Sequence, residues 1–113
     1  MSQSAIAKTI TAISERGKLT GVDVANITKV SKATVSRWFA GTAVPRPKTE
    51  LVLSDLRYVV DRLAEFYTPD ETRMWLYSRN DLLDGQTAMD LIHQERTDEV
   101  LMAIEQLDSL AYL

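Results

Sequence analysis

Apolar residues recur along almost the whole chain at steps of three and four, the spacing of one face of an α-helix. β-Branched residues never alternate cleanly with polar ones, so no strand pattern competes. The longest stretch, from Thr49 to Tyr67, has its apolar face at Val52, Leu56, Val59, Val60, Leu63, Phe66 and Tyr67. The pattern predicts an all-α fold with helices over residues 4–16, 20–28, 31–40, 48–67, 69–78, 87–94 and 97–111.

Residues that begin and end helices stand at the borders of these stretches. Hydroxyl side chains are expected to cap four helix N-termini: Thr20, Ser31, Thr68 and Thr87. Left-handed residues that end helices are expected at three glycines: Gly17, Gly41 and Gly85. The segment 42–47, with Pro45 and Pro47, is the clearest interruption.

Composition narrows the class of protein. The 113 residues are 45% hydrophobic and 26% charged, which is typical of a globular chain with one core, or of two small units sharing one. No apolar run approaches the roughly 20 residues of a membrane span, and the first residues do not form a secretion signal. Without cysteine there is neither a disulfide framework nor a thiolate metal site. We therefore expect a cytoplasmic protein that does not enter membranes.

The net charge of −3 hides an asymmetry. Residues 1–50 hold eight Lys and Arg against three Asp and Glu, a formal +5, whereas residues 51–113 hold five against thirteen, a formal −8. Such a division suggests that the first half faces a polyanion and that the second half meets another partner. The alternative is that these charges only keep the helix surfaces soluble.

The segment from Val24 to Gly41 has the pattern of two helices that cross steeply through a short turn. Ala25 is small where the two backbones would approach, and Val24, Val30, Val35 and Trp38 would face inward. The outward residues of the second helix are short or basic, as a helix in a DNA major groove requires. Lys32 and Arg37 would contact bases or phosphates, and the hydroxyl residues would mainly position the helix. The candidate DNA-binding residues are Ser31, Lys32, Ala33, Thr34, Ser36 and Arg37.

This segment resembles the helix-turn-helix of the Xre/Cro-type repressors, including the closing Trp38-Phe39-Ala40-Gly41. Two residues depart from the family pattern: Lys29 replaces the usual turn glycine, and Ile27 is apolar where the family is usually polar. We expect a strained turn at Lys29 and an extra packing contact at Ile27. The resemblance implies binding to operator DNA as a homodimer, because one helix reads only a few base pairs. A helical hairpin that only packs remains the alternative.

The second half contains apolar residues expected to bury together: Trp75, Leu76, Leu82, Leu83, Leu91, Ile92, Val100, Ile104 and Leu107. Further apolar residues near the end of the chain fall wholly or partly outside that set, amid carboxylates: Leu101, Met102, Leu110, Tyr112 and Leu113. An apolar patch rimmed by acidic groups is a candidate partner surface. These residues could equally close the core or form a homodimer.

This half resembles the C-terminal domain of the Xre/MbcA/ParS-type antitoxins of RES–Xre toxin–antitoxin systems. The matching residues are Trp75-Leu76, Asn80, Leu82-Leu83-Asp84-Gly85, Asp90-Leu91-Ile92 and Asp98-Glu99-Val100-Leu101. Together with the helix-turn-helix, the resemblance covers most of residues 20–110, and it departs at Ala88, where the family commonly has Pro. It implies three parts: a helix-turn-helix region at 1–47, a connecting helix at 48–67 and a toxin-binding domain at 68–113.

The resemblance implies an antitoxin that forms a hetero-oligomer with a RES-domain, NAD-degrading toxin, occludes its active site and represses their shared operon. The terminal helix would fill the toxin's cofactor cleft, its carboxylates meeting the cations that a pyrophosphate site carries. The expected toxin-binding residues are Asp98, Glu99, Met102, Glu105, Asp108, Leu110, Tyr112 and Leu113.

Convergent reactive groups are scarce, so the sequence does not predict an enzyme. His93 is the single histidine and is expected to pack or cap rather than act as a base or a ligand. No phosphate-binding glycine loop, paired metal-binding histidines or nucleophile elbow occurs, so no cofactor and no metal are expected. Two alternatives stay open: a stand-alone dimeric Xre-type repressor whose acidic half only dimerises or senses a ligand, and a helix-turn-helix that serves only as a dimerisation scaffold.

Overall fold

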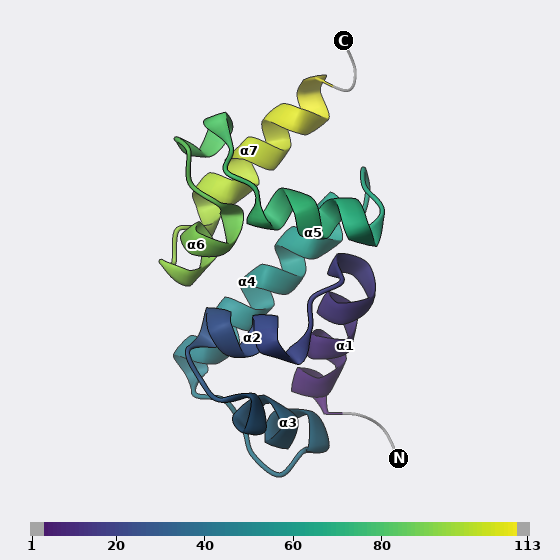
Figure 1. Cartoon of the computed structure of the whole chain (residues 1–113), viewed down its shortest axis with the longest axis vertical. Coiled ribbons are helices and arrows are strands. Elements are labelled where there is room, and N and C mark those ends of the chain that lie inside the picture. The colour runs from purple at the N-terminus through teal and green to yellow at the C-terminus, as the bar shows by residue number, and fades with distance from the viewer. Residues whose placement is uncertain (1–3, 111–113) are drawn as a thin grey trace.

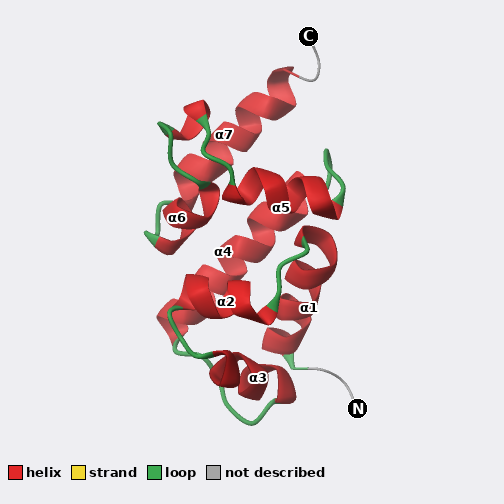
Figure 2. Cartoon of the chain, in the orientation of Figure 1, coloured by secondary structure: helices red, strands yellow, loops and turns green. Residues whose placement is uncertain are grey.

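The computed structural model describes residues 4–110, which form an elongated molecule of about 48 × 27 × 20 Å (Figures 1 and 2). Its elements are α1 (Ala5–Gly17), α2 (Gly21–Thr28), α3 (Lys32–Ala40), α4 (Pro47–Leu63), α5 (Pro69–Tyr77), the short 3-10 helix η1 (Asp81–Leu83), α6 (Ala88–His93) and α7 (Thr97–Leu110). Within these residues the extended pairing is limited to one isolated bridge, between Asn80 and Gln86. The predicted all-α fold is confirmed, and each predicted helix is present.

Helix α4 runs through the middle of the molecule, with α1–α3 packed towards one end and α5–α7 towards the other (Figure 1). Five of its residues are buried: Leu53, Leu56, Val59, Val60 and Leu63. The sequence prediction had placed Val52 on this face and extended the helix to Tyr67. Instead Val52 is half-buried, and the helix ends at Leu63 in a turn that leaves Phe66 and Tyr67 half-buried. Leu53 was missed because α4 packs against helices on two sides, which widens its buried stripe.

Two apolar clusters hold the helices together. The smaller one lies among α1–α4 and consists of Ile10, Val24, Ala25, Val35, Trp38 and Leu53. The larger one takes Ile13, Leu19 and Ile27 from the first half and joins them to α4 and to the helices of the second half. The two halves therefore share a core. The division at residues 47 and 67 stays a prediction.

The predicted N-terminal caps form as expected. The hydroxyls of Thr20, Ser31, Thr68 and Thr87 each accept a hydrogen bond from the amide three residues on, at 3.3, 3.1, 3.3 and 3.0 Å. At Thr20 and Thr68 a carboxylate returns the bond and completes a capping box. These caps fix where α2, α3, α5 and α6 begin.

The prediction for Gly17 was wrong, whereas Gly41 and Gly85 adopt the left-handed conformation, with φ of 82° and 78°. Gly17 lies inside α1, and the left-handed residue is Lys18, with φ of 53°. A β-carbon at Gly17 would lie 3.2 Å from Cγ2 of Val60. Gly17 is therefore small because α1 lies close against α4 there.

Three of the nine apolar residues predicted to be buried in the second half are not fully buried. Leu82 is 44% exposed, because it neighbours the buried Leu83 in the tight turn of η1, where consecutive side chains diverge. Leu107 is half-buried, as is Trp75, which packs on the edge of the larger cluster. The remaining members are buried: Leu76, Leu83, Leu91, Ile92, Val100 and Ile104.

Candidate DNA-binding and partner-binding surfaces

Helices α2 and α3 are joined by a turn that begins with a left-handed residue. Lys29 ends α2 with φ of 56°, as expected for a residue standing where a glycine is usual. The amide of Val30 donates to the carbonyl oxygen of Ala25 at 3.0 Å and closes the turn. Ile27 is 5% exposed and belongs to the larger cluster, so the expected extra packing contact exists.

Helix α3 buries one side and exposes the side that carries the candidate DNA-binding residues. Val35 and Trp38 are buried in the smaller cluster, together with Val24 and Ala25 of α2. Five candidates are exposed and Thr34 is half-buried; the exposed ones are Ser31, Lys32, Ala33, Ser36 and Arg37. The structure therefore brings the predicted residues to one surface of the molecule, at the end that α3 occupies in Figure 1.

A chain of hydrogen bonds along α3 positions Arg37. The Ser31 hydroxyl lies 2.9 Å from the Thr34 hydroxyl and accepts from the Thr34 amide at 3.1 Å. The Thr34 hydroxyl in turn accepts a bond of 3.0 Å from Nη2 of Arg37. The guanidinium of the exposed Arg37 is thus held against α3 through Thr34.

The candidate partner surface lies on the outer side of α7. Met102 and Leu110 are 65% and 60% exposed, and the carboxylates of Asp98 and Glu105 are exposed beside them. Leu101 instead packs against the larger cluster. Tyr112 and Leu113, also predicted to bind the toxin, lie outside the described residues.

Three of the four carboxylates predicted to contact the toxin form ion pairs with arginines of this same chain. Arg96 makes a bidentate pair with Glu99 at 2.6 and 2.7 Å, and this hydrogen bonding lowers the pKa of Glu99. Arg62 of α4 lies 3.5 Å from Glu105 and 3.8 Å from Asp108. Among residues 4–110 the structure shows no ion pair for Asp98.

Sequence reasoning missed both arginines. The pair Arg96–Glu99 has the three-residue spacing of neighbours on a helix and could have been found. Arg62 precedes its partners on α7 by more than 40 residues, so only the fold reveals it.

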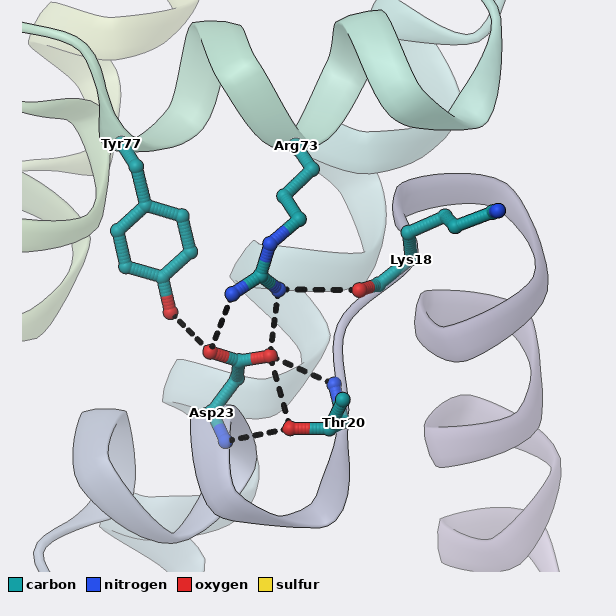
Figure 3. A network of polar contacts seen from close by, with 5 residues as sticks. All are labelled: Lys18, Thr20, Asp23, Arg73 and Tyr77. Carbon is teal, nitrogen blue, oxygen red and sulfur yellow. Dashed lines mark hydrogen bonds and ion pairs between the residues drawn. The ribbon is translucent and has the colours of Figure 1, made fainter.

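A buried carboxylate joins the two halves of the molecule (Figure 3). Asp23 of α2, with its side chain 9% exposed, accepts hydrogen bonds from Nη1 and Nη2 of Arg73 at 2.6 and 3.3 Å. Tyr77 of α5 donates to the same carboxylate at 2.5 Å, and Thr20 donates through its amide and its hydroxyl. Arg73 also donates to the carbonyl oxygen of Lys18 at 3.0 Å.

The electrostatics of this junction favour the ionised form of Asp23. Burial alone would raise the pKa of Asp23, but hydrogen bonds from Arg73, Thr20 and Tyr77 outweigh it and hold the pKa well below its usual range. Burial, followed by the bond to Asp23, raises the pKa of Tyr77 well above its ordinary value. The site is therefore a partly buried ion pair that joins α2 to α5.

Two further contacts join the halves. His93 is half-buried, and its Nδ1 lies 2.7 Å from the carbonyl oxygen of Ile27, so it packs at the junction. Lys48 pairs with Glu95 at 3.6 Å. In the part of the chain that the structure describes, no three potential metal ligands gather, and no helix is long and apolar enough to cross a membrane.

The chain is similar to antitoxins over nearly its full length, although no protein-family model matches it. It is 34% identical to the mycobacterial cidal antitoxin MbcA of Mycobacterium tuberculosis, over 95% of both chains, and equally to that of Mycobacterium bovis. A probable mycobacterial cidal antitoxin of M. tuberculosis is 37% identical over 84% of this chain and 81% of its own length.

A solved structure agrees with these relatives. The fold matches a chain of the crystal structure of the M. tuberculosis MbcT–MbcA toxin–antitoxin complex with a TM-score of 0.79, at 34% identity, over 90% of this chain and 92% of that one. The fold and these relatives together define a helical protein of the antitoxin class. The chain belongs to the family of the mycobacterial cidal antitoxin MbcA.

Proposed function

We propose that this chain is an antitoxin that binds a RES-domain, NAD-degrading toxin, occludes its active site with α7 and represses their operon through α2 and α3. The observation that carries the proposal is the match, over 90% of this chain, to one chain of a toxin–antitoxin complex. In this proposal all the chemistry belongs to the toxin, and the antitoxin needs no cofactor.

The outer side of α7 supports the toxin-binding role. Met102 and Leu110 leave apolar area in water, which a partner would cover. The side chain of Glu105 is 72% exposed, and Asp98 is exposed one turn before Met102. Carboxylates around apolar anchors suit a cleft whose cations bind a pyrophosphate.

Deleting residues 109–113 tests the occlusion. The deletion begins there because Leu107 and Asp108 are half-buried, whereas Ser109 and Leu110 are exposed. We expect the shortened chain to stay folded and to bind promoter DNA, yet to fail to rescue growth when the neighbouring toxin gene is co-expressed. A shortened chain that still protects cells would contradict the proposal.

A matched pair of substitutions sharpens this test. Met102→Ser removes an apolar side chain that is 65% exposed on α7, and Met74→Ser removes one that is 67% exposed on α5. Only the first is expected to weaken capture of the toxin in a pull-down. Equal effects would place the partner surface elsewhere.

The exposed side of α3 supports the second role. It combines short side chains with Lys32 and Arg37, in the half of the chain that carries a formal +5. We propose that two copies bind a two-fold operator, because one such helix reads only a few base pairs. Gel shifts on the chain's own promoter, repeated at rising salt, test this. A chain that binds promoter DNA but never the toxin would be a stand-alone repressor.

A further inference from the structure

We propose that Arg62 is a positioning residue for toxin neutralisation: it holds the C-terminal part of α7 at a fixed angle to the body. This inference rests on the function proposed above for α7. It concerns a residue that lies outside the candidate contact surface and acts through the carboxylates it holds.

Helix α7 is tied to α4 at two points. Near its start, the Thr97 hydroxyl donates to Oδ2 of Asp55 at 3.0 Å. Further along, Nη2 of Arg62 lies 3.5 Å from Glu105 and 3.8 Å from Asp108. Asp55 and Arg62 are seven residues apart, about two helical turns, and so lie on the same side of α4.

The second tie is the last one before α7 leaves the body. Figure 1 shows the C-terminal end of α7 extending beyond the other helices, and Ser109 and Leu110 are exposed. Buried residues of α7 are Thr97, Val100, Ala103 and Ile104, all of which precede Glu105. Apolar packing therefore holds the first part of the helix, and Arg62 holds the part that would reach a partner.

Arg62 differs from an ordinary surface cation. Its side chain is only 21% exposed, and its guanidinium faces three carboxylates: Glu65, Glu105 and Asp108. Without it these carboxylates would repel one another, and the end of α7 would move or fray. A toxin would then have to order this segment as it binds, which weakens the complex.

Arg62→Met tests the role, because it keeps the aliphatic stem and removes the guanidinium. Arg57→Met is the matched control on the same helix, since Arg57 faces Asp61 and Thr9 rather than α7. The measurement is binding of the full chain to catalytically inactive toxin. We expect Arg62→Met to raise the dissociation constant of this complex roughly threefold to tenfold. Arg57→Met should leave it unchanged, and Arg62→Lys should recover part of the loss.

Hydrogen exchange in the free chain separates positioning from general stability. Arg62→Met should speed exchange at residues 105–110 and leave α1–α3 as they are. Wild-type exchange and affinity in Arg62→Met would overturn the inference, as would equal weakening in Arg57→Met. If deleting 109–113 leaves toxin binding intact, the function proposed for α7 fails. If that deletion abolishes binding and Arg62→Met does not weaken it, only the role of Arg62 fails.

Discussion

At the scale of single residues, the fold uses some polar groups more than once. Asp23 completes the capping box of α2 and at the same time holds Arg73 and Tyr77 of α5. Arg73 further stacks over the Tyr77 ring, 4.9 Å from its centroid. Replacing this one carboxylate therefore disturbs a helix start and the junction between the halves together.

We expect Asp23→Asn to lower the free energy of unfolding by about 2 kcal/mol at neutral pH. The loss falls short of a fully buried pair because the Arg73 side chain stays 40% exposed and can be hydrated. Asp70→Asn is the control, since Asp70 pairs with Lys18 but its side chain is 76% exposed. Urea unfolding of both variants measures the difference. Equal losses would show that the junction at Asp23 stabilises the fold no more than an exposed ion pair does.

The same carboxylate predicts a pH dependence. Because the pKa of Asp23 is lowered in the folded chain, its contribution is complete above the ordinary value near 4. It is lost as pH falls from there towards the folded pKa. Urea titrations at pH 7, 4 and 3 should show the gap between wild type and Asp23→Asn narrowing below pH 4. A gap that widens on acidification would contradict the assignment.

Arg37 is a single residue on which DNA binding is expected to depend. Arg37→Ala should weaken binding to the promoter, by about 1–3 kcal/mol if the guanidinium makes a bidentate base contact. Thr34→Val should weaken it less, because it removes only the hydroxyl that holds Nη2. Gel shifts on promoter and on scrambled DNA distinguish base reading from phosphate binding, since only the former changes the preference between the two.

At the scale of helices, signals local in the sequence predicted most of the fold. Capping hydroxyls and apolar spacing placed every α-helix, because both act within a few residues of chain. Leu53 and the end of α4 were missed, since both depend on which helices meet. Leu82 was missed because the tight turn of η1 directs it away from its buried neighbour Leu83. The candidate residues on α3 were predicted by the same local logic, whereas Arg62 and the junction at Asp23 join segments far apart and carry no local signal.

Gly17 provides a test at this scale. Gly17→Ala should gain about 1 kcal/mol of helix propensity but crowd Val60, whose two methyl groups would lie 3.2 and 3.3 Å from the new carbon. Val60 is fully buried and stiff, so we expect a net loss of about 1 kcal/mol in thermal unfolding. Gly21→Ala, with nothing within 4 Å, should be neutral or stabilising. A stabilised Gly17→Ala would mean that α1 and α4 separate easily.

At the scale of the whole molecule, the shared core predicts that both halves unfold together. Trp38 lies in the smaller cluster and Trp75 on the edge of the larger one. In Trp75→Phe, the fluorescence of Trp38 reports the first half, and circular dichroism reports all helices. We expect the two denaturation curves to coincide. Separate transitions would instead support independent domains divided near residue 47 or 67.

The placement of Ile13, Leu19 and Ile27 beneath α4 and the second half also bears on turnover of the protein. A cut between the halves would divide the larger cluster and leave bare apolar area on both fragments. Proteolysis would therefore remove the whole molecule rather than leave a working remnant. Under the proposed function, a cell that degrades this chain would free the toxin and the promoter in the same event.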